Sequence, residues 1–152
     1  MLRLFKLDGG FIREMTVEKH NLTGQLQEAQ WVDMCEPDEE EHSLLESLLL
    51  TDLPEFDDVE EIESSARCFV DQAGVHVHSL FMYQEDGRHS TVSVAFILQG
   101  ERLITIRDEK LADFRLFRLR ARRGQVTCSN IADLFVTLLE QKVENHADYL
   151  ED

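Results

Sequence analysis

Four strand-like runs between residues 67 and 106 limit what this chain can fold into more than any other feature. They cover residues 67–70, 75–83, 91–98 and 103–106, and they are rich in β-branched and aromatic residues. Turn-forming segments separate them, namely residues 71–74, a polar loop that holds Gly87, and Gly100. The spacing predicts consecutive β-strands joined by short connections, so the middle of the chain should form a sheet.

The N-terminal third predicts a hairpin, a strand and a helix. Residues 2–7 and 11–17 are short apolar runs on either side of an Asp-Gly-Gly turn signal. Residues 31–34 form another strand-like run, which Pro37 ends. Acidic residues at 38–41 then open a helix, where the helix dipole favours them, and leucines at 44, 45, 48 and 49 form its apolar stripe.

Two helices are predicted to close the chain. The first covers residues 111–123, with a buried stripe at Phe114, Phe117 and Ala121. The second begins at Ser129 or Asn130, and its apolar residues keep a helical spacing to the end of the sequence. Because no Gly, Asn or Pro stop signal stands near that end, we expect the sequence to stop inside a longer helix.

Composition excludes several classes of function. The 152 residues are enough for one domain, and the formal net charge is −16 with a pI of about 4.6. Such a balance disfavours nucleic acids and anionic membranes, because phosphate binding needs Lys and Arg. Three widely spaced cysteines without a CxxC pair indicate reduced thiols and a cytosolic setting. We find no signal peptide and no apolar stretch long enough to span a membrane.

Residues 54–63, PEFDDVEEIE, hold six carboxylates and no basic residue. In a helix, Asp57, Asp58 and Glu61 fall together on the side opposite the apolar stripe, and Glu60 lies at the border. The like-charge pairs at three- and four-residue spacing cost about 1–2 kcal/mol together, which a domain tolerates on a solvated face. The alternative is a weak site for Mg²⁺, a hard cation that prefers oxygen ligands and keeps several waters.

Two further patterns allow alternative interpretations. His76 and His78 share one face of a strand, where they are either two half-exposed histidines or zinc ligands without a recognised third partner. Residues 114–123, FRLFRLRARR, form a basic helix in an acidic protein. Its arginines either pair with carboxylates of the same or a neighbouring subunit, or bind phosphate or lipid headgroups. Neither a nucleophile motif nor a glycine-rich phosphate loop is present, which disfavours an enzyme.

Four segments, in order, resemble the N-terminal cytoplasmic domain of CorA-type magnesium transporters, and most closely the proteobacterial members. They are residues 31–41 (WVDMCEPDEEE), 59–69 (VEEIESSARCF), 74–79 (GVHVHS), and 103–107 (LITIR) with the Phe-Arg helix that follows. The resemblance implies a three-layer α/β/α domain with a mixed sheet and helices on both faces. It also implies a long stalk helix leading to two membrane spans with a Gly-Met-Asn motif, and a homopentamer with regulatory Mg²⁺ between neighbouring domains.

By position, the acidic pair of that family falls on Glu60 and Glu61, and a further acidic position falls on Thr137, which carries no carboxylate. We therefore expect residues 1–152 to be a single Mg²⁺-sensing domain at the cytoplasmic face of the inner membrane. Asp57, Asp58, Glu60 and Glu61 are the candidate metal ligands. The alternatives are the related zinc transporters, in which His42, His76 or His78 would matter more, and a free-standing acidic interaction module.

Overall fold

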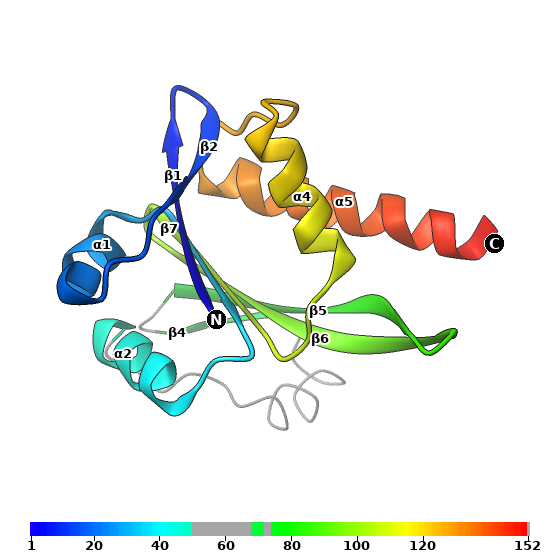
Figure 1. Ribbon diagram of the computed structural model, residues 1–152, viewed down its shortest axis with the longest axis horizontal. Helices are drawn as coiled ribbons and strands as arrows, with labels where there is room; N and C mark the ends of the chain where they lie inside the picture. The colour runs from blue at the N-terminus through cyan, green and yellow to red at the C-terminus, as the bar shows by residue number, and fades with distance from the viewer. Residues whose placement is uncertain (50–67, 72–73, 152) are drawn as a thin grey trace.

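One mixed sheet of seven strands organises the chain (Figure 1). The computed structural model describes residues 1–49, 68–71 and 74–151. Within them the strand order is β2-β1-β3-β7-β6-β5-β4. The strands are β1 (Leu2–Asp8), β2 (Phe11–Met15), β3 (Trp31–Cys35), β4 (Cys68–Asp71), β5 (Gly74–Glu85), β6 (Arg88–Gln99) and β7 (Arg102–Arg107).

The strands β3 and β7 lie side by side in the sheet and run parallel, whereas the other described pairs are antiparallel. Their register places Asp33 opposite Thr105 and Cys35 opposite Arg107. These residues alternate with Val32, Met34, Ile104 and Ile106, which belong to the core on the other face. Polar side chains of β3 and β7 therefore collect on one face, near the carboxyl ends of both strands.

The predicted strands are confirmed, and the polar connection that holds Gly87 is shorter than predicted. Strands β5 and β6 pair without interruption to Glu85 and Arg88, which leaves a two-residue turn of Asp86 and Gly87. Both turn residues have positive φ, 50° and 77°, as a type I′ hairpin requires. The local Asp-Gly signal decides the connection, and the polar residues on either side extend the strands.

Helices cover both faces of the sheet, which confirms the predicted three-layer α/β/α fold (Figure 1). Helices α1 (Leu22–Glu28) and α2 (Glu39–Leu49) pack through Leu26 and Leu45 against one face. Helices α4 (Ala112–Arg122) and α5 (Ile131–Glu151) pack against the other. The stripe predicted for α4 is buried, with Phe114, Phe117 and Ala121 at most 6% exposed.

Side-chain caps fix where two of the predicted helices begin. The Asp38 carboxylate accepts a bond of 2.7 Å from the Glu41 N–H, and Glu41 accepts one of 3.2 Å from the Asp38 N–H. This reciprocal pair is a capping box. At α5, Asn130 Oδ1 accepts a bond of 2.8 Å from the Asp133 N–H, as expected for an N-cap residue.

Helix α1 was not predicted, because a glutamine occupies its buried face. Gln25 is 8% exposed and accepts a bond of 2.8 Å from the Glu18 N–H, while its amide donates to Thr16 O at 2.7 Å. A buried polar residue interrupts the apolar periodicity that marks a helix, and Gly24 further weakens the helical signal. The buried position of Gln25 is explained by its hydrogen bonds to the loop at Thr16 and Glu18.

Candidate functional site

The predicted metal ligands Asp57, Asp58, Glu60 and Glu61 lie outside the described residues. Within the described ranges, no three His, Cys, Asp or Glu side chains are grouped so that they could hold a metal ion. Thr137, the predicted departure from the family pattern, is half-buried, and its hydroxyl donates to Asp133 O at 2.7 Å. Its hydroxyl is therefore occupied within α5.

The prediction that His76 and His78 are half-exposed is wrong. Each is 2% exposed, on the face of β5 that also carries the apolar core of α1 and α2. Phe69 of β4 stacks on the His76 ring at 4.5 Å and meets the His78 ring edge-on at 5.6 Å. Burial, and secondarily His76, lower the pKa of His78, so we expect this ring to be neutral at pH 7.

The arginines of α4 make some of the internal ion pairs that were predicted. Arg120 lies 3.2 Å from Glu144 and also donates to Gln141 at 2.8 Å. Arg118 approaches Asp33 at 3.9 Å. Arg115 has no ion-pair partner in the described part of the chain. Internal pairing thus accounts for only part of the basic helix.

The basic helix lies beside the carboxyl ends of the two parallel strands. After β3 the chain passes to α2 on one face of the sheet, and after β7 it passes to α4 on the opposite face. When neighbouring parallel strands continue to opposite faces, a crevice opens outside their carboxyl ends, and α/β proteins bind ligands in such crevices. In this protein the crevice lies where β3, β7 and the start of α4 meet.

A buried polar network forms the floor of this crevice. Asp33 is 1% exposed and accepts a bond of 2.7 Å from the Thr105 hydroxyl and another from Arg107 Nη1. The Thr105 hydroxyl in turn accepts a bond of 3.0 Å from the Trp31 indole. The guanidinium carbon of Arg107 lies 4.0 Å from the centroid of the Phe114 ring. These contacts hold Arg107 in one orientation, and the residue is buried, with only 3% of it exposed.

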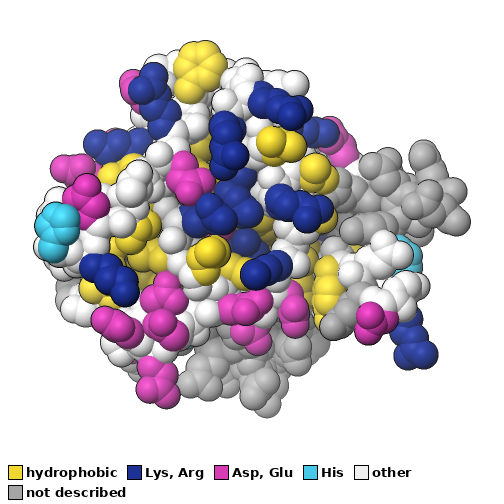
Figure 2. Space-filling model, viewed as in Figure 1, with side chains coloured by type: hydrophobic (Ala, Val, Ile, Leu, Met, Phe, Trp, Pro, Cys, Tyr) yellow, Lys and Arg dark blue, Asp and Glu magenta, His cyan; other side chains and the backbone are white. Residues whose placement is uncertain are grey.

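We call the space above this floor the switch-point cavity, and its volume is about 460 Å³. Tyr83 and Gln84 from β5, and Leu111 and Ala112 at the start of α4, contribute to its walls. Five described lining side chains are cationic: Arg3, Arg107, Lys110, Arg115 and Arg118. Figure 2 shows Lys and Arg side chains gathered in the middle of this face, with Asp and Glu mostly toward its lower and left edges.

The cavity carries an excess of positive charge. Asp33 is the one carboxylate among the described residues of its lining. Burial lowers the pKa of Arg118, and the nearby guanidinium groups of Arg3 and Arg107 lower it further, against the attraction of Asp33. Burial also raises the pKa of the Cys35 thiol, which therefore adds no negative charge at pH 7.

Sequence comparison supplies the family. A family model described as CorA-like Mg²⁺ transporter protein matches residues 27–152. The chain belongs to this family. The magnesium transport protein CorA of Haemophilus ducreyi is 39% identical over 152 residues, covering 99% of this chain and 47% of that protein. CorA of Escherichia coli K12 is 37% identical over 153 residues, covering 100% of this chain and 48% of that protein.

The resemblance predicted from four short segments is thus confirmed. The chain spans about half the length of the curated relatives it matches. Within its described residues, no helix is both long enough and apolar enough to cross a bilayer. Magnesium transport by the relatives is therefore a property of proteins that are about twice as long.

Solved structures agree on the fold. CorA of Methanocaldococcus jannaschii superposes with a TM-score of 0.70 at 15% identity, covering 99% of this chain and 47% of that one. The cytoplasmic domain of ZntB from Vibrio parahaemolyticus superposes with a TM-score of 0.63 at 12% identity, covering 98% and 61%. At these identities the likeness concerns the fold alone, and it does not discriminate between magnesium and zinc.

Proposed function

We propose that this chain is the Mg²⁺-sensing cytoplasmic domain of a magnesium transport channel and is not an enzyme. The observation that carries the proposal is the match to proteins named magnesium transport protein CorA along the whole chain. The expected site is the acidic stretch that holds Asp57, Asp58, Glu60 and Glu61. Sensing, the pentameric assembly and the location at the cytoplasmic face of the inner membrane are parts of the same proposal.

Charge supplies the mechanism. Each subunit carries a formal charge of −16, so neighbouring domains repel one another. At high intracellular Mg²⁺, ions bridge the acidic faces of adjacent domains and offset this repulsion. When Mg²⁺ falls, the domains separate and the pore opens. The ion biases the equilibrium because it binds the bridged state more tightly than the separated state.

The sensing step is tested by calorimetric titration of the chain with MgCl₂. Carboxylates without a closed cage bind Mg²⁺ through water, so we expect a dissociation constant on the order of 10⁻³ M. The double substitution Glu60→Ala/Glu61→Ala should weaken binding strongly. Glu39→Ala/Glu40→Ala in the first turn of α2 makes the same charge change at another exposed acidic pair and serves as the matched control.

Equal Mg²⁺ binding by these two double variants would mean that the acidic stretch is a solvated face and not a Mg²⁺ site. Transport is tested separately, by growth at limiting Mg²⁺ of a bacterial strain that lacks its own Mg²⁺ uptake and carries the full-length gene that encodes this sequence. Restored zinc uptake without magnesium uptake would favour the zinc-transporter alternative. Failure to restore either magnesium or zinc uptake would favour the free-standing interaction module.

A further inference from the structure

We propose that the switch-point cavity binds a small molecule that carries a phosphate group, such as a nucleotide or a sugar phosphate. The described residues that line this cavity are different from the proposed Mg²⁺ ligands, and the cavity takes a ligand of opposite charge. Five cationic side chains and one carboxylate line the described part of the cavity, in a protein whose formal net charge is −16. Arg3 pairs with Glu14 at 3.0 Å, and the other four cationic side chains still leave an excess of positive charge here, against the overall balance of the molecule.

The two innermost arginines still have hydrogen bonds to donate. Arg107 uses Nη1 for Asp33, but its buried Nε has no partner among the described residues, and neither has the buried Nη1 of Arg118 in hydrogen-bonding geometry. A single carboxylate cannot satisfy two guanidinium groups, which together carry up to ten N–H donors. Because these two atoms are themselves buried, a phosphate in the cavity would mainly compensate the charge of the two guanidinium groups, while the exposed guanidinium of Arg115 can donate to its oxygens.

The residues at the mouth of the cavity are free to take part. Lys110 and Arg115 are exposed, and neither has an ion-pair partner in the part of the chain that the structure describes. Lys110 stands just before α4 and Arg115 in its first turns, so both can move onto a bound anion without breaking an ion pair of the described residues. The N-terminus of α4 faces the same cavity through Leu111 and Ala112 and adds a favourable dipole.

Size and charge decide what kind of anion fits. A volume of about 460 Å³ lies in the range of small-molecule sites and exceeds what one inorganic phosphate fills. Tyr83 and Ala112, both partly exposed, offer apolar surface for an organic portion. A polyanion such as nucleic acid, or an anionic membrane, would extend beyond the cavity and meet the acidic remainder of the surface (Figure 2).

The test is calorimetric titration of the 152-residue chain in EDTA, which removes divalent cations and so separates this site from the Mg²⁺ proposal. The ligands are AMP, glucose 6-phosphate, adenosine, glucose and inorganic phosphate. We expect at least one of the two phosphate esters to bind more tightly than inorganic phosphate, and the uncharged compounds not to bind. Affinity should fall as NaCl is raised, because salt screens the attraction. Absence of binding by both esters at millimolar concentration would overturn the proposal, as would equal binding of adenosine and AMP.

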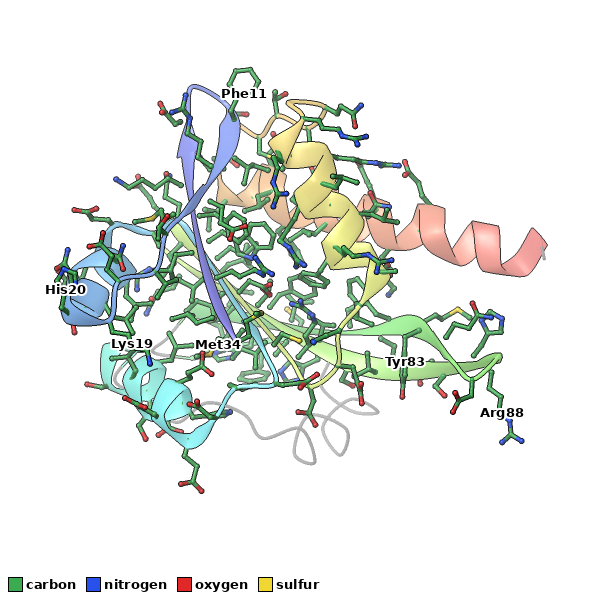
Figure 3. All side chains as sticks on the ribbon, in the orientation of Figure 1. Phe11, Lys19, His20, Met34, Tyr83 and Arg88 are labelled. Carbon is green, nitrogen blue, oxygen red and sulfur yellow. The ribbon has the colours of Figure 1, made fainter. Side chains whose placement is uncertain are left out.

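Variants assign the binding to the cavity. Lys110→Gln/Arg115→Gln should weaken binding about a hundredfold, on the basis of about tenfold for each charged hydrogen bond lost. The control Arg88→Gln/Arg123→Gln removes the same charge elsewhere, at the β5–β6 turn, where Arg88 points away from the molecule (Figure 3), and after α4. Unfolding curves should be unchanged for both. Equal weakening in the two double variants would mean a general charge effect and would refute the assignment.

Discussion

Replacing Asp33 by asparagine tests the buried network on which the switch-point cavity is built. The substitution keeps the size of the side chain and removes one negative charge. Asp33 is 1% exposed and lies against Arg107, which is 3% exposed, and near Arg118, whose side chain is 16% exposed. Without the carboxylate, two guanidinium groups stay buried with no opposite charge among the described residues that line the cavity.

The expected cost follows from this burial. Removing one partner of a buried ion pair typically costs about 3–5 kcal/mol, because the remaining charge stays desolvated. The asparagine oxygen still accepts the hydrogen bond from Thr105, so we expect the lower end, about 3 kcal/mol. Arg107→Gln should cost less, because Asp33 keeps Thr105 and Arg118 as partners. The double variant should be more stable than the sum of the two single changes predicts.

Urea unfolding at pH 7 measures the effect, with fluorescence of Trp31 as the probe. Trp31 is the only tryptophan of the chain and is fully buried, stacked on Phe5 at 4.2 Å. Glu144→Gln is the control: it removes an ion pair of 3.2 Å whose partners are 44% and 60% exposed, and it should change stability by less than about 1 kcal/mol. A loss below about 1 kcal/mol for Asp33→Asn as well would refute the account of the network.

Gly74→Ala should lower the midpoint of thermal unfolding by several degrees, because a Cβ at this position would lie 2.2 Å from the Leu98 carbonyl oxygen and the residue has a φ of 137°. Circular dichroism during heating measures the midpoint, and an unchanged value would contradict the described backbone. His78 should contribute to acid sensitivity. Its lowered folded-state pKa means that the unfolded chain binds more protons as the pH falls below about 6.5, so stability decreases there. Urea unfolding at neutral and mildly acidic pH should show a smaller decrease for His78→Gln than for His20→Gln, whose exposed ring points outward (Figure 3); equal decreases would contradict the burial of His78.

Local sequence signals predicted most of the secondary structure. Turn residues located the hairpin of β1 and β2, the run of acidic residues after Pro37 located the start of α2, and apolar spacing located α4 and α5. These features depend on contacts between residues close in sequence, which a local pattern records directly. Helix α1 was not predicted, because the hydrogen-bond partners of Gln25, at Thr16 and Glu18, lie outside the helix.

Of the two candidate sites, one is visible in the sequence and the other is visible only in the structure. The acidic stretch with Asp57, Asp58, Glu60 and Glu61 is visible in the sequence as a charge run, and it remains a prediction. The switch-point cavity is not visible as a run, because Asp33, Arg107 and Arg118 come from three distant elements. The sequence signal that pointed toward it was a basic helix in an acidic chain.

By itself the sequence determined most of the segments that become strands and helices, the acidic character of the molecule and, through four short motifs, the family. These follow from local propensity, periodicity and composition, which need no knowledge of distant neighbours. Tertiary structure alone decided that β3 and β7 are parallel neighbours and that their chain continuations leave to opposite faces. It also decided that His76 and His78 are buried, because burial depends on what packs against a strand, and pairing between segments far apart in the chain brings those surfaces together.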